Sequence, residues 1–386
     1  MTTSERRRAG RLLLCLLGPR HGEAQNVSTA DWANAARLAR EHRLGPQLHG
    51  RIGRIGTVDG FPSHVAAEWA EAFRANALTV LAQRQAMVAA QAVLLDAGIA
   101  AVALKGAVLA WTVWPAPAER IMRDLDLLVP EERAVEAYRV LRANGWSGPD
   151  RATTRLDRIA REETHLPPLV SPHGVALELH AHVWRSSPFA DHAMPPCDSA
   201  AFMDRAVWSG EAGAYVPAAN DMLAHLVVHA ACSHLFNVGP LAVADVDYWL
   251  RAHPIDWPAF WTRARRDGFA RAAALVLALT DRWRTPGLLD RAQCLFRPDE
   301  TVIDEAETLL FQRVAARKDI NLIAGLRSRV GTFRQRVARH PLDHADDKSR
   351  GSELARRSLS LVRSLANRST RESGFATHRI ARWMRG

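Results

Sequence analysis

The sequence has few cysteines and lacks the short motifs that mark several large enzyme classes. Its four cysteines, Cys15, Cys197, Cys232 and Cys294, are far apart and form no C-x-x-C pair. This argues against a zinc ribbon and a disulfide framework and fits a cytoplasmic location. G-x-S-x-G, P-loop and dinucleotide-binding fingerprints are also missing. Their absence disfavours hydrolases of the α/β type, P-loop ATPases and dehydrogenases.

Long hydrophobic runs are scarce as well. Three arginines at 6–8 precede an apolar run at 12–17, an order that imitates a signal peptide. The apolar run is short and no small-x-small cleavage site follows it, so an amphipathic first helix is expected instead. No stretch approaches the length needed to cross a bilayer, and we expect no membrane span.

Positive charge exceeds negative charge and gathers near the end of the chain. The formal net charge is +10, and residues 350–386 hold nine Arg and two Glu, which gives 9 − 2 = +7 for this segment. One interpretation is a surface for nucleic acid or another anionic partner. The other is a solvated, Arg-rich helix face, which the absence of an aromatic-basic recognition pattern favours.

The pattern of apolar residues divides the chain into four predicted parts. The spacing of apolar residues predicts helices in the N-terminal region. After Gly98 the pattern predicts strands that alternate with helices, and from about residue 220 it predicts helices again. The predicted parts are an N-terminal helical region (1–97), a core (98–190), a helical domain (191–300) and a helical basic C-terminal region (301–386). The predicted fold class is therefore α+β, with a small mixed sheet between helical flanks.

Three short segments of the core have the pattern of strands. Residues 99–104 form an apolar run, 125–129 a second, and 175–183 alternate between apolar and polar side chains. A short helix is expected over 107–114 and a longer one from Pro130 to about Asn144. In the helical domain, helices are expected from Asn220 or Asp221 to Phe236, and over 240–252, 256–267 and 269–284.

Two acids stand at the start of the second predicted strand. Asp124 and Asp126 are two residues apart, so in a strand they point the same way while Leu125 and Leu127 face the core. Two carboxylates on one face repel each other unless a cation lies between them. Mg²⁺ prefers carboxylate oxygens and leaves positions open for phosphates, with Mn²⁺ as the alternative.

A third acid lies in the third predicted strand. Glu178 shares one face with His180 and His182, whereas Leu177 and Leu179 share the other. If this strand lies beside the Asp126 strand, Glu178 completes a three-carboxylate site able to hold two metal ions, as in phosphoryl transfer. The two histidines, which flank this site, are candidate substrate contacts.

Positive groups flank the acids along the chain. Lys105 and Gly106 stand at a strand-to-helix turn, where backbone N–H groups and the helix dipole favour phosphate. Arg120 and Arg123 lead into the acidic pair and are candidates to neutralise phosphate oxygens.

A group of histidines occurs in the predicted helical domain. His225 and His229 are four residues apart, on one helix face with Asp221, and His234 follows. Zinc binding is one interpretation. The other, a hydrogen-bonded packing role, is favoured because the H-E-x-x-H pattern is absent.

Taken in order, these motifs resemble the uncharacterised bacterial nucleotidyltransferase-like family of the DNA polymerase β superfamily, over about residues 80–285. The resemblance rests on Leu104-Lys105-Gly106-Ala107, Arg120, Arg123-Asp124-Leu125-Asp126-Leu127-Leu128-Val129, Leu177-Glu178-Leu179-His180, Asp221-Met222-Leu223-Ala224-His225, His229, His234, Ala244-Asp245-Val246-Asp247 and Ile255-Asp256-Trp257. It implies a mixed-sheet nucleotidyltransferase core with an appended helical domain. It also implies Asp124, Asp126 and Glu178 as magnesium ligands and catalytic acids. The Gly-Ser turn of the wider superfamily, whose hydroxyl helps to hold the triphosphate, is Gly106-Ala107 here, and Lys105 is the residue that can compensate.

The activity that the resemblance implies is attack by an acceptor hydroxyl on the α-phosphorus of an NTP such as ATP, with pyrophosphate leaving. Lys105, Arg120 and Arg123 would stabilise the phosphates. Family members accompany various biosynthetic clusters, including some for modified peptides, so membership does not fix the acceptor, which is expected to be a small molecule or a peptide. One alternative is a catalytically degenerate scaffold that binds a partner or peptide. Another is an RNA- or tRNA-modifying toxin that uses the Arg-rich tail.

Overall fold

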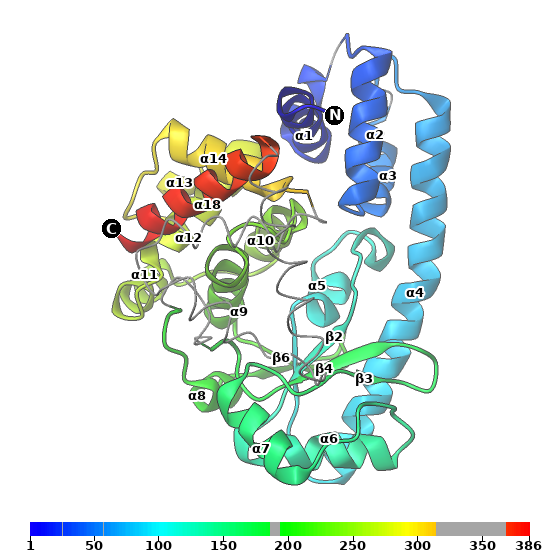
Figure 1. The fold of residues 1–386 in the computed structure, drawn as a ribbon, viewed down its shortest axis with the longest axis vertical. Coiled ribbons are helices and arrows are strands. Elements are labelled where there is room, and N and C mark those ends of the chain that lie inside the picture. Colours follow the sequence, from blue (N-terminus) through cyan, green and yellow to red (C-terminus); the bar gives the residue numbers. More distant parts are fainter. Residues whose placement is uncertain (25, 57, 186–193, 314–367) are drawn as a thin grey trace, which may run out of the picture.

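A computed structural model of the protein describes residues 1–24, 26–56, 58–185, 194–313 and 368–386. A short mixed sheet lies at one end of the molecule, and two groups of helices lie on either side of the other end (Figure 1). A single long helix runs from the N-terminal helices down to the sheet (Figure 1). The predicted α+β fold class with a mixed sheet is confirmed.

The sheet has six strands in the order β3-β4-β2-β1-β6-β5. Their bounds are β1 Val102–Leu104, β2 Leu125–Leu128, β3 Leu169–Val170, β4 Ala176–His180, β5 Val207–Ser209 and β6 Ala214–Val216. β2 pairs antiparallel with β1 and parallel with β4. The three predicted strands are confirmed, but the β5–β6 hairpin lies in a region predicted to be all helical. Each of its strands has three residues, which is too short to display an alternating pattern.

The N-terminal region consists of helices, as predicted. They are α1 (Thr3–Leu17), η1 (Pro19–Glu23), α2 (Thr29–Glu41), α3 (Gly45–Ile55) and α4 (Ser63–Asp96). α1 is amphipathic and buries Leu13 and Leu16 completely. The Arg284 guanidinium donates a hydrogen bond to the carbonyl of Leu17 at its end, so the first helix is an integral part of the fold.

Helix α4 corrects one expectation. Its 34 residues are long and apolar enough to cross a membrane by length and composition, whereas no such segment was expected. About 33% of its most apolar window is buried inside the fold, and core helices of other proteins pass the same test, so this is weak evidence for a span. One face packs Trp69, Val80 and Met87 into the interior. The helix ends at Asp96, and Gly98, with a φ of +67°, closes the turn that follows it.

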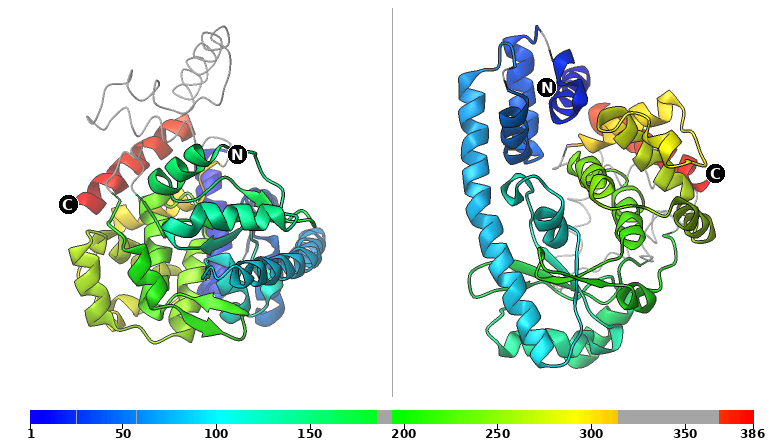
Figure 2. Two further views of the ribbon diagram at one scale, coloured as in Figure 1. Left: turned by 90° about the horizontal axis from the view of Figure 1, so that it is seen from below. Right: turned by 180° about the vertical axis from the view of Figure 1, so that it is seen from behind.

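Helices cover both faces of the sheet. Their bounds are α5 Gly106–Thr112, η2 Pro117–Glu119, η3 Glu131–Arg133, α6 Ala134–Ala143, α7 Thr153–Glu162 and α8 Ser199–Asp204. α6 and α7 lie on one side of the strands and α5 on the other, a layering visible from the front in Figure 1 and from behind in Figure 2. The predicted helices of the core are confirmed in position.

The second group of helices follows the sheet in the chain. It contains α9 (Ala219–Val227), the π-helix η4 (Val228–Ser233), α10 (Leu241–Ala252), α11 (Trp257–Arg266), α12 (Ala270–Trp283), α13 (Leu288–Arg291), α14 (Glu300–Leu310) and α18 (Arg368–Arg385). Three predicted helices match α10, α11 and α12. The predicted helix from residue 220 instead begins without a side-chain cap and changes into a π-helix before Phe236.

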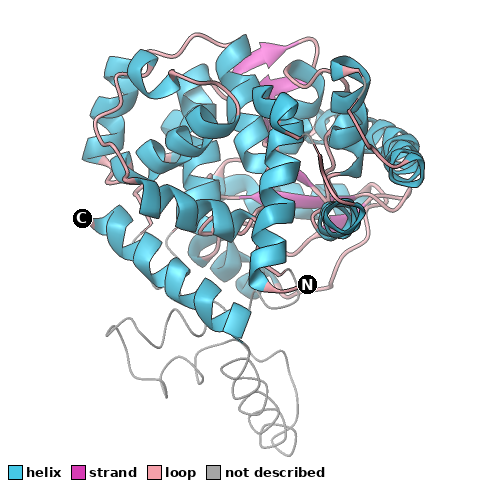
Figure 3. Ribbon diagram, turned by 90° about the horizontal axis from the view of Figure 1, so that it is seen from above, coloured by secondary structure: helices cyan, strands magenta, loops and turns pink. Residues whose placement is uncertain are grey.

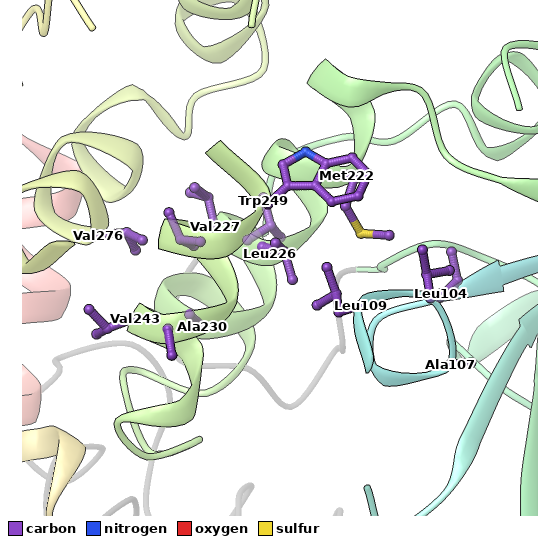
Figure 4. Packing of buried hydrophobic residues seen from close by; sticks show 14 of the residues in the cluster. Leu104, Ala107, Leu109, Met222, Leu226, Val227, Ala230, Val243, Trp249 and Val276 are labelled. Atoms are coloured by element: carbon purple, nitrogen blue, oxygen red, sulfur yellow. The ribbon is translucent and has the colours of Figure 1, made fainter. Parts of the chain in front are cut away.

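Apolar side chains join the second group to the sheet. Figure 4 shows Leu109 of α5 pointing toward Leu226 and Met222 of α9. Viewed from above, helices make up most of the molecule, and one pair of short strands lies at its edge (Figure 3). One buried cluster draws residues from all four predicted parts of the chain. The domain boundaries themselves stay a prediction.

The Arg-rich C-terminal segment is described from residue 368 onward; residues 350–367 of this prediction lie outside the described part. α18 packs against α14 and α12. Ala376 and Ile380 are buried, so α18 belongs to the folded body.

Candidate active site

The register of two parallel strands brings the predicted acids together. Asp126 of β2 lies directly opposite Glu178 of β4, and Leu104 of β1 flanks Asp126 on the other side. The expectation that the Glu178 strand lies beside the Asp126 strand is confirmed. Leu125 and Leu127, on the other face of β2, are buried as predicted.

Asp126 is the most enclosed of the acids, with 4% of its surface exposed. Its Oδ1 accepts a hydrogen bond from Lys105 Nζ at 2.9 Å and lies 2.8 Å from His180 Nε2. Burial alone would raise the pKa of this carboxyl, but the Lys105 ammonium and the His180 hydrogen bond hold its pKa well below the usual range. Asp126 is therefore ionised.

Glu178 and Asp124 complete a group of three carboxylates. Glu178 Oε2 lies 3.6 Å from His165 Nε2 and 3.8 Å from His180 Nε2. Burial raises the pKa of Glu178, and the neighbouring charges of Asp126 and Asp124 raise it further. Burial and then Asp126 also raise the pKa of Asp124, which stands just before β2. These carboxylates repel one another, as expected of a site built for a cation.

The closest set of metal-ligating atoms consists of Asp126, Glu178 and His180. One atom from each lies within 4.8 Å of the others. Neighbouring ligands of an octahedral ion with bonds of about 2.1 Å are about 3 Å apart, and opposite ligands about 4.2 Å, so this spacing fits a divalent cation. Two carboxylates and one imidazole suit Mg²⁺ or, because of the nitrogen, Mn²⁺. Metal ligation by Asp124 stays a prediction.

Lys105 and Gly106 occupy the predicted turn between β1 and α5. Lys105 has a φ of +43°, a conformation that costs a residue with a side chain about 1–3 kcal/mol. This backbone accompanies the contact of its ammonium with Asp126. A Cβ on Gly106 would strike Arg120 Nη1 and come within 2.7 Å of Met122 Cγ. Glycine is therefore required for close packing at this turn.

The two predicted phosphate-binding arginines have different surroundings. Arg120 is 6% exposed, and its Nε and Nη2 donate to the two oxygens of Asp245 at 2.8 and 2.7 Å. Trp114 Nε1 donates to the same carboxylate at 2.9 Å. Arg120 thus joins the core to α10. Arg123 is exposed and lines the same cavity as the acids. Phosphate binding by either residue stays a prediction.

His180 and His182 also separate. His180 contacts Asp126, as described above. His182 faces α7 instead: its Nε2 lies 3.0 Å from the Ala160 carbonyl oxygen and 2.8 Å from Arg185 Nη1. It does not line the cavity in the part of the chain that the structure describes. Because β4 ends at His180, strand alternation no longer sets the direction of His182, and the geometry disfavours the predicted substrate contact.

A cavity of about 790 Å³ opens in front of the acids. Lys105, Asp124, Asp126, Glu178 and His180 line one side of it. The other sides come from segments that sequence reasoning did not assign to the site: the turn after α2, the α9–η4 segment and α18. The residues from these segments are His42, Arg43, His225, Leu226, His229, Ser233, His234, Thr377, His378, Ala381 and Arg385. The Arg-rich composition of the tail and the spacing of the histidines were the available signals.

Among the described residues, Asp221, His225 of α9, His229 of η4 and His234 do not form a metal-ligating group. The favoured hydrogen-bonded packing role is wrong for His225, because neither of its ring nitrogens has a partner among the described residues. Both carboxylate oxygens of Asp221 are bound by arginines: Oδ2 by Arg205 at 2.8 Å, and Oδ1 by Arg205 at 2.9 Å and by Arg263. Asp221 is therefore turned away from His225 and His229 and stabilises the helix packing.

Comparison with known proteins agrees with this geometry. A family described as "Uncharacterised nucleotidyltransferase" matches residues 28–285, and the chain belongs to this family. The matched segment includes the acids, Lys105 and the α9 histidines. No curated protein matches the chain. The class defined by fold and site is thus a nucleotidyltransferase with a candidate divalent-metal site at Asp126, Glu178 and His180.

Proposed function

We propose that the protein transfers a nucleoside monophosphate from an NTP to a hydroxyl acceptor in a reaction that depends on Mg²⁺ or Mn²⁺. The observation that carries the proposal is the opposition of Asp126 and Glu178 across β2 and β4, with His180 beside them and Asp124 in the lining of the same cavity. A bound divalent ion would neutralise the acids and polarise the phosphate under attack. In this proposal the acceptor is a small molecule or a peptide, and the reaction takes place in the cytoplasm. The proposal also places the family in the DNA polymerase β superfamily of bacteria.

The residues of the chain divide the remaining tasks. Asp126, Glu178 and His180 hold the ion, and the half-buried Glu178 is placed to take the proton of the acceptor hydroxyl. Lys105 contacts Asp126 and, once a cation compensates that carboxylate, its ammonium can turn to a phosphate oxygen. Arg123, exposed at the cavity edge, is the second cation available to the phosphates.

The test is transfer of label from each of the four α-labelled NTPs to a panel of hydroxyl acceptors with Mg²⁺ or Mn²⁺. Asp126→Asn removes a charge from the ion site and is expected to lower transfer at least about a hundred-fold. Asp96→Asn, the same change at an exposed position at the end of α4, is the control. Equal transfer by wild type and Asp126→Asn would exclude catalysis at this site.

A catalytically degenerate scaffold is the second candidate, and the Lys105–Asp126 ion pair favours it. An ammonium 2.9 Å from the central carboxylate competes with a metal ion for the same oxygen. Calorimetry with Mn²⁺ and with Mg-NTP decides between the two candidates. The scaffold predicts that neither binds, and that replacing Lys105 with Met restores metal binding.

The RNA-modifying alternative makes a separate prediction. It requires RNA affinity that falls steeply with salt and that is lost when residues 350–386 are removed. Because α18 lines the cavity, Arg385→Gln provides a milder variant that leaves the helix in place. RNA binding unaffected by salt and by this variant excludes the alternative.

A further inference from the structure

Four aromatic rings form a column in the wall of the cavity that also contains the acids. Trp184 and His225 stack with ring centroids 6.1 Å apart and an interplanar angle of 24°. His225 and His229 stack at 6.1 Å and 21°, and His234 meets His229 edge-on at 4.5 Å. All four rings line the cavity. The column fixes the imidazole planes, so their nitrogens have defined directions.

His225 is buried but has no hydrogen-bond partner. It is 2% exposed, and both Nδ1 and Nε2 lack a partner among the described residues. Buried polar groups are nearly always hydrogen-bonded, because an unpaired one has lost its interactions with water without replacement. The imidazole lines the cavity, so a ligand or a water molecule in that cavity can supply the missing partner.

The backbone around the column is unusual. Val228–Ser233 form a π-helix, a rare form that is frequently found at functional sites. Leu235 and Phe236 follow with φ values of +46° and +63°, which bulky side chains rarely adopt. The extra residue of the π-helix changes the direction of the chain at His229 and His234. The fold thus tolerates strained backbone at the place where these rings enter the cavity.

The charges that face the column are mainly positive. Burial holds the pKa of His225 and of His229 well below the usual range, and the Lys105 ammonium lowers both further. His180 lowers the pKa of His225 as well, and His234 lowers the pKa of His229. The Asp126 carboxylate raises the pKa of both histidines. Arg43, Arg123, Arg185 and Arg385 line the rest of the cavity. A ligand with several anionic oxygens complements the positive charge of this wall.

We infer that His225 and His229 bind the polyphosphate chain of the nucleotide. This inference rests on the proposed function and specifies where its substrate lies. Imidazole N–H groups donate to phosphate oxygens, and the arriving negative charge stabilises the imidazolium form. Binding of polyphosphate is therefore coupled to uptake of protons from solution.

The test is calorimetry of Mg-tripolyphosphate binding to the full chain at pH 7, in two buffers that differ in ionisation enthalpy. Wild type is expected to bind with net proton uptake. His225→Phe keeps the ring and its stacking but removes both nitrogens, and His229→Phe does the same one turn later. Each is expected to weaken binding about ten-fold and to lower proton uptake. His225→Gln restores a hydrogen bond without a charge, so it is expected to recover affinity but not proton uptake.

His64→Phe, at an exposed histidine of α4, is the matched control and is expected to behave as wild type. Thermal melting of each variant reports whether it is folded. Binding by folded His225→Phe and His229→Phe within two-fold of wild type overturns the inference, as does binding without proton uptake. If this inference is wrong, wild type is still expected to transfer nucleotides and Asp126→Asn is still expected to lower the transfer. Failure of the proposed function instead appears as absence of transfer by wild type, whatever tripolyphosphate does.

Discussion

The buried ion pair between Arg120 and Asp245 makes the sharpest stability prediction. Both side chains are 7% exposed, and two hydrogen bonds of 2.8 and 2.7 Å join them. Trp114 donates a third to the same carboxylate. Asp245→Leu would leave a guanidinium charge and an indole N–H without their acceptor. Removing one partner of a buried pair costs about 3–5 kcal/mol, a large part of a typical unfolding free energy of about 5–15 kcal/mol.

Urea unfolding followed by circular dichroism measures this cost. Asp245→Leu is expected to lose about 3–5 kcal/mol. The double change Arg120→Met/Asp245→Leu is expected to recover most of it, because no unpaired charge remains. Glu71→Gln breaks the exposed pair with Arg74 and should change stability by less than about 0.5 kcal/mol. A loss below about 1 kcal/mol for Asp245→Leu, or a double variant no better than the single one, refutes the structural role given to Arg120.

Three further predictions concern the site and its surroundings. Gly106→Ala forces a methyl group against neighbouring side chains, so urea unfolding should show a loss of about 1–3 kcal/mol; an unchanged midpoint contradicts this packing. Burial raises the pKa of the Cys232 thiol to about 12, so a thiol reagent at pH 8 should label it only on unfolding, and rapid labelling of native protein argues against that burial. The pKa of His225 is lowered, so the unfolded chain binds protons that the native state does not. Stability should be complete above pH 6.5 and fall as pH drops below it, with a shallower fall in His225→Phe; identical pH profiles would show that His225 is not buried as a neutral ring.

Much of the site follows from local pattern. The two-residue spacing of Asp124 and Asp126, together with the alternation around Glu178, predicts strands with acids on one face. The two predicted strands are close in chain order, so their pairing is the simplest arrangement. β2 and β4 do pair, and Asp126 lies opposite Glu178. The helical character of the segment before Gly98 is also predictable, because residues 64–97 contain no Gly or Pro.

Other features depend on contacts that no local pattern contains. Arg120 resembles a phosphate ligand until Asp245, 125 residues later, is seen beside it. His182 is four residues after Glu178, so in a continuous strand it would lie on the same face. The strand ends at His180, however, and the His182 ring faces α7. His225 of α9 and His229 of η4 have the spacing of a packed helix face, and only the tertiary fold shows that they line the same cavity as the acids.

The Arg-rich C-terminal segment, residues 350–386, shows that composition alone does not reveal tertiary contacts either. Its excess of arginine predicts either a nucleic-acid surface or a solvated helix face. In the described part, α18 buries Ile380 and turns Thr377 and Arg385 to the cavity. Charge counts cannot reveal this, because they do not distinguish the side of the helix that packs from the side that faces solvent.

The most direct test of the central claim is a titration of Mn²⁺ followed by electron paramagnetic resonance, with a non-hydrolysable NTP present. Wild type should bind the ion, with hyperfine coupling to one imidazole nitrogen from His180. Asp126→Asn should weaken binding by about ten- to a hundred-fold, the scale of a lost metal-site interaction. Binding of equal strength in wild type and Asp126→Asn would contradict a metal site at the junction of β2 and β4.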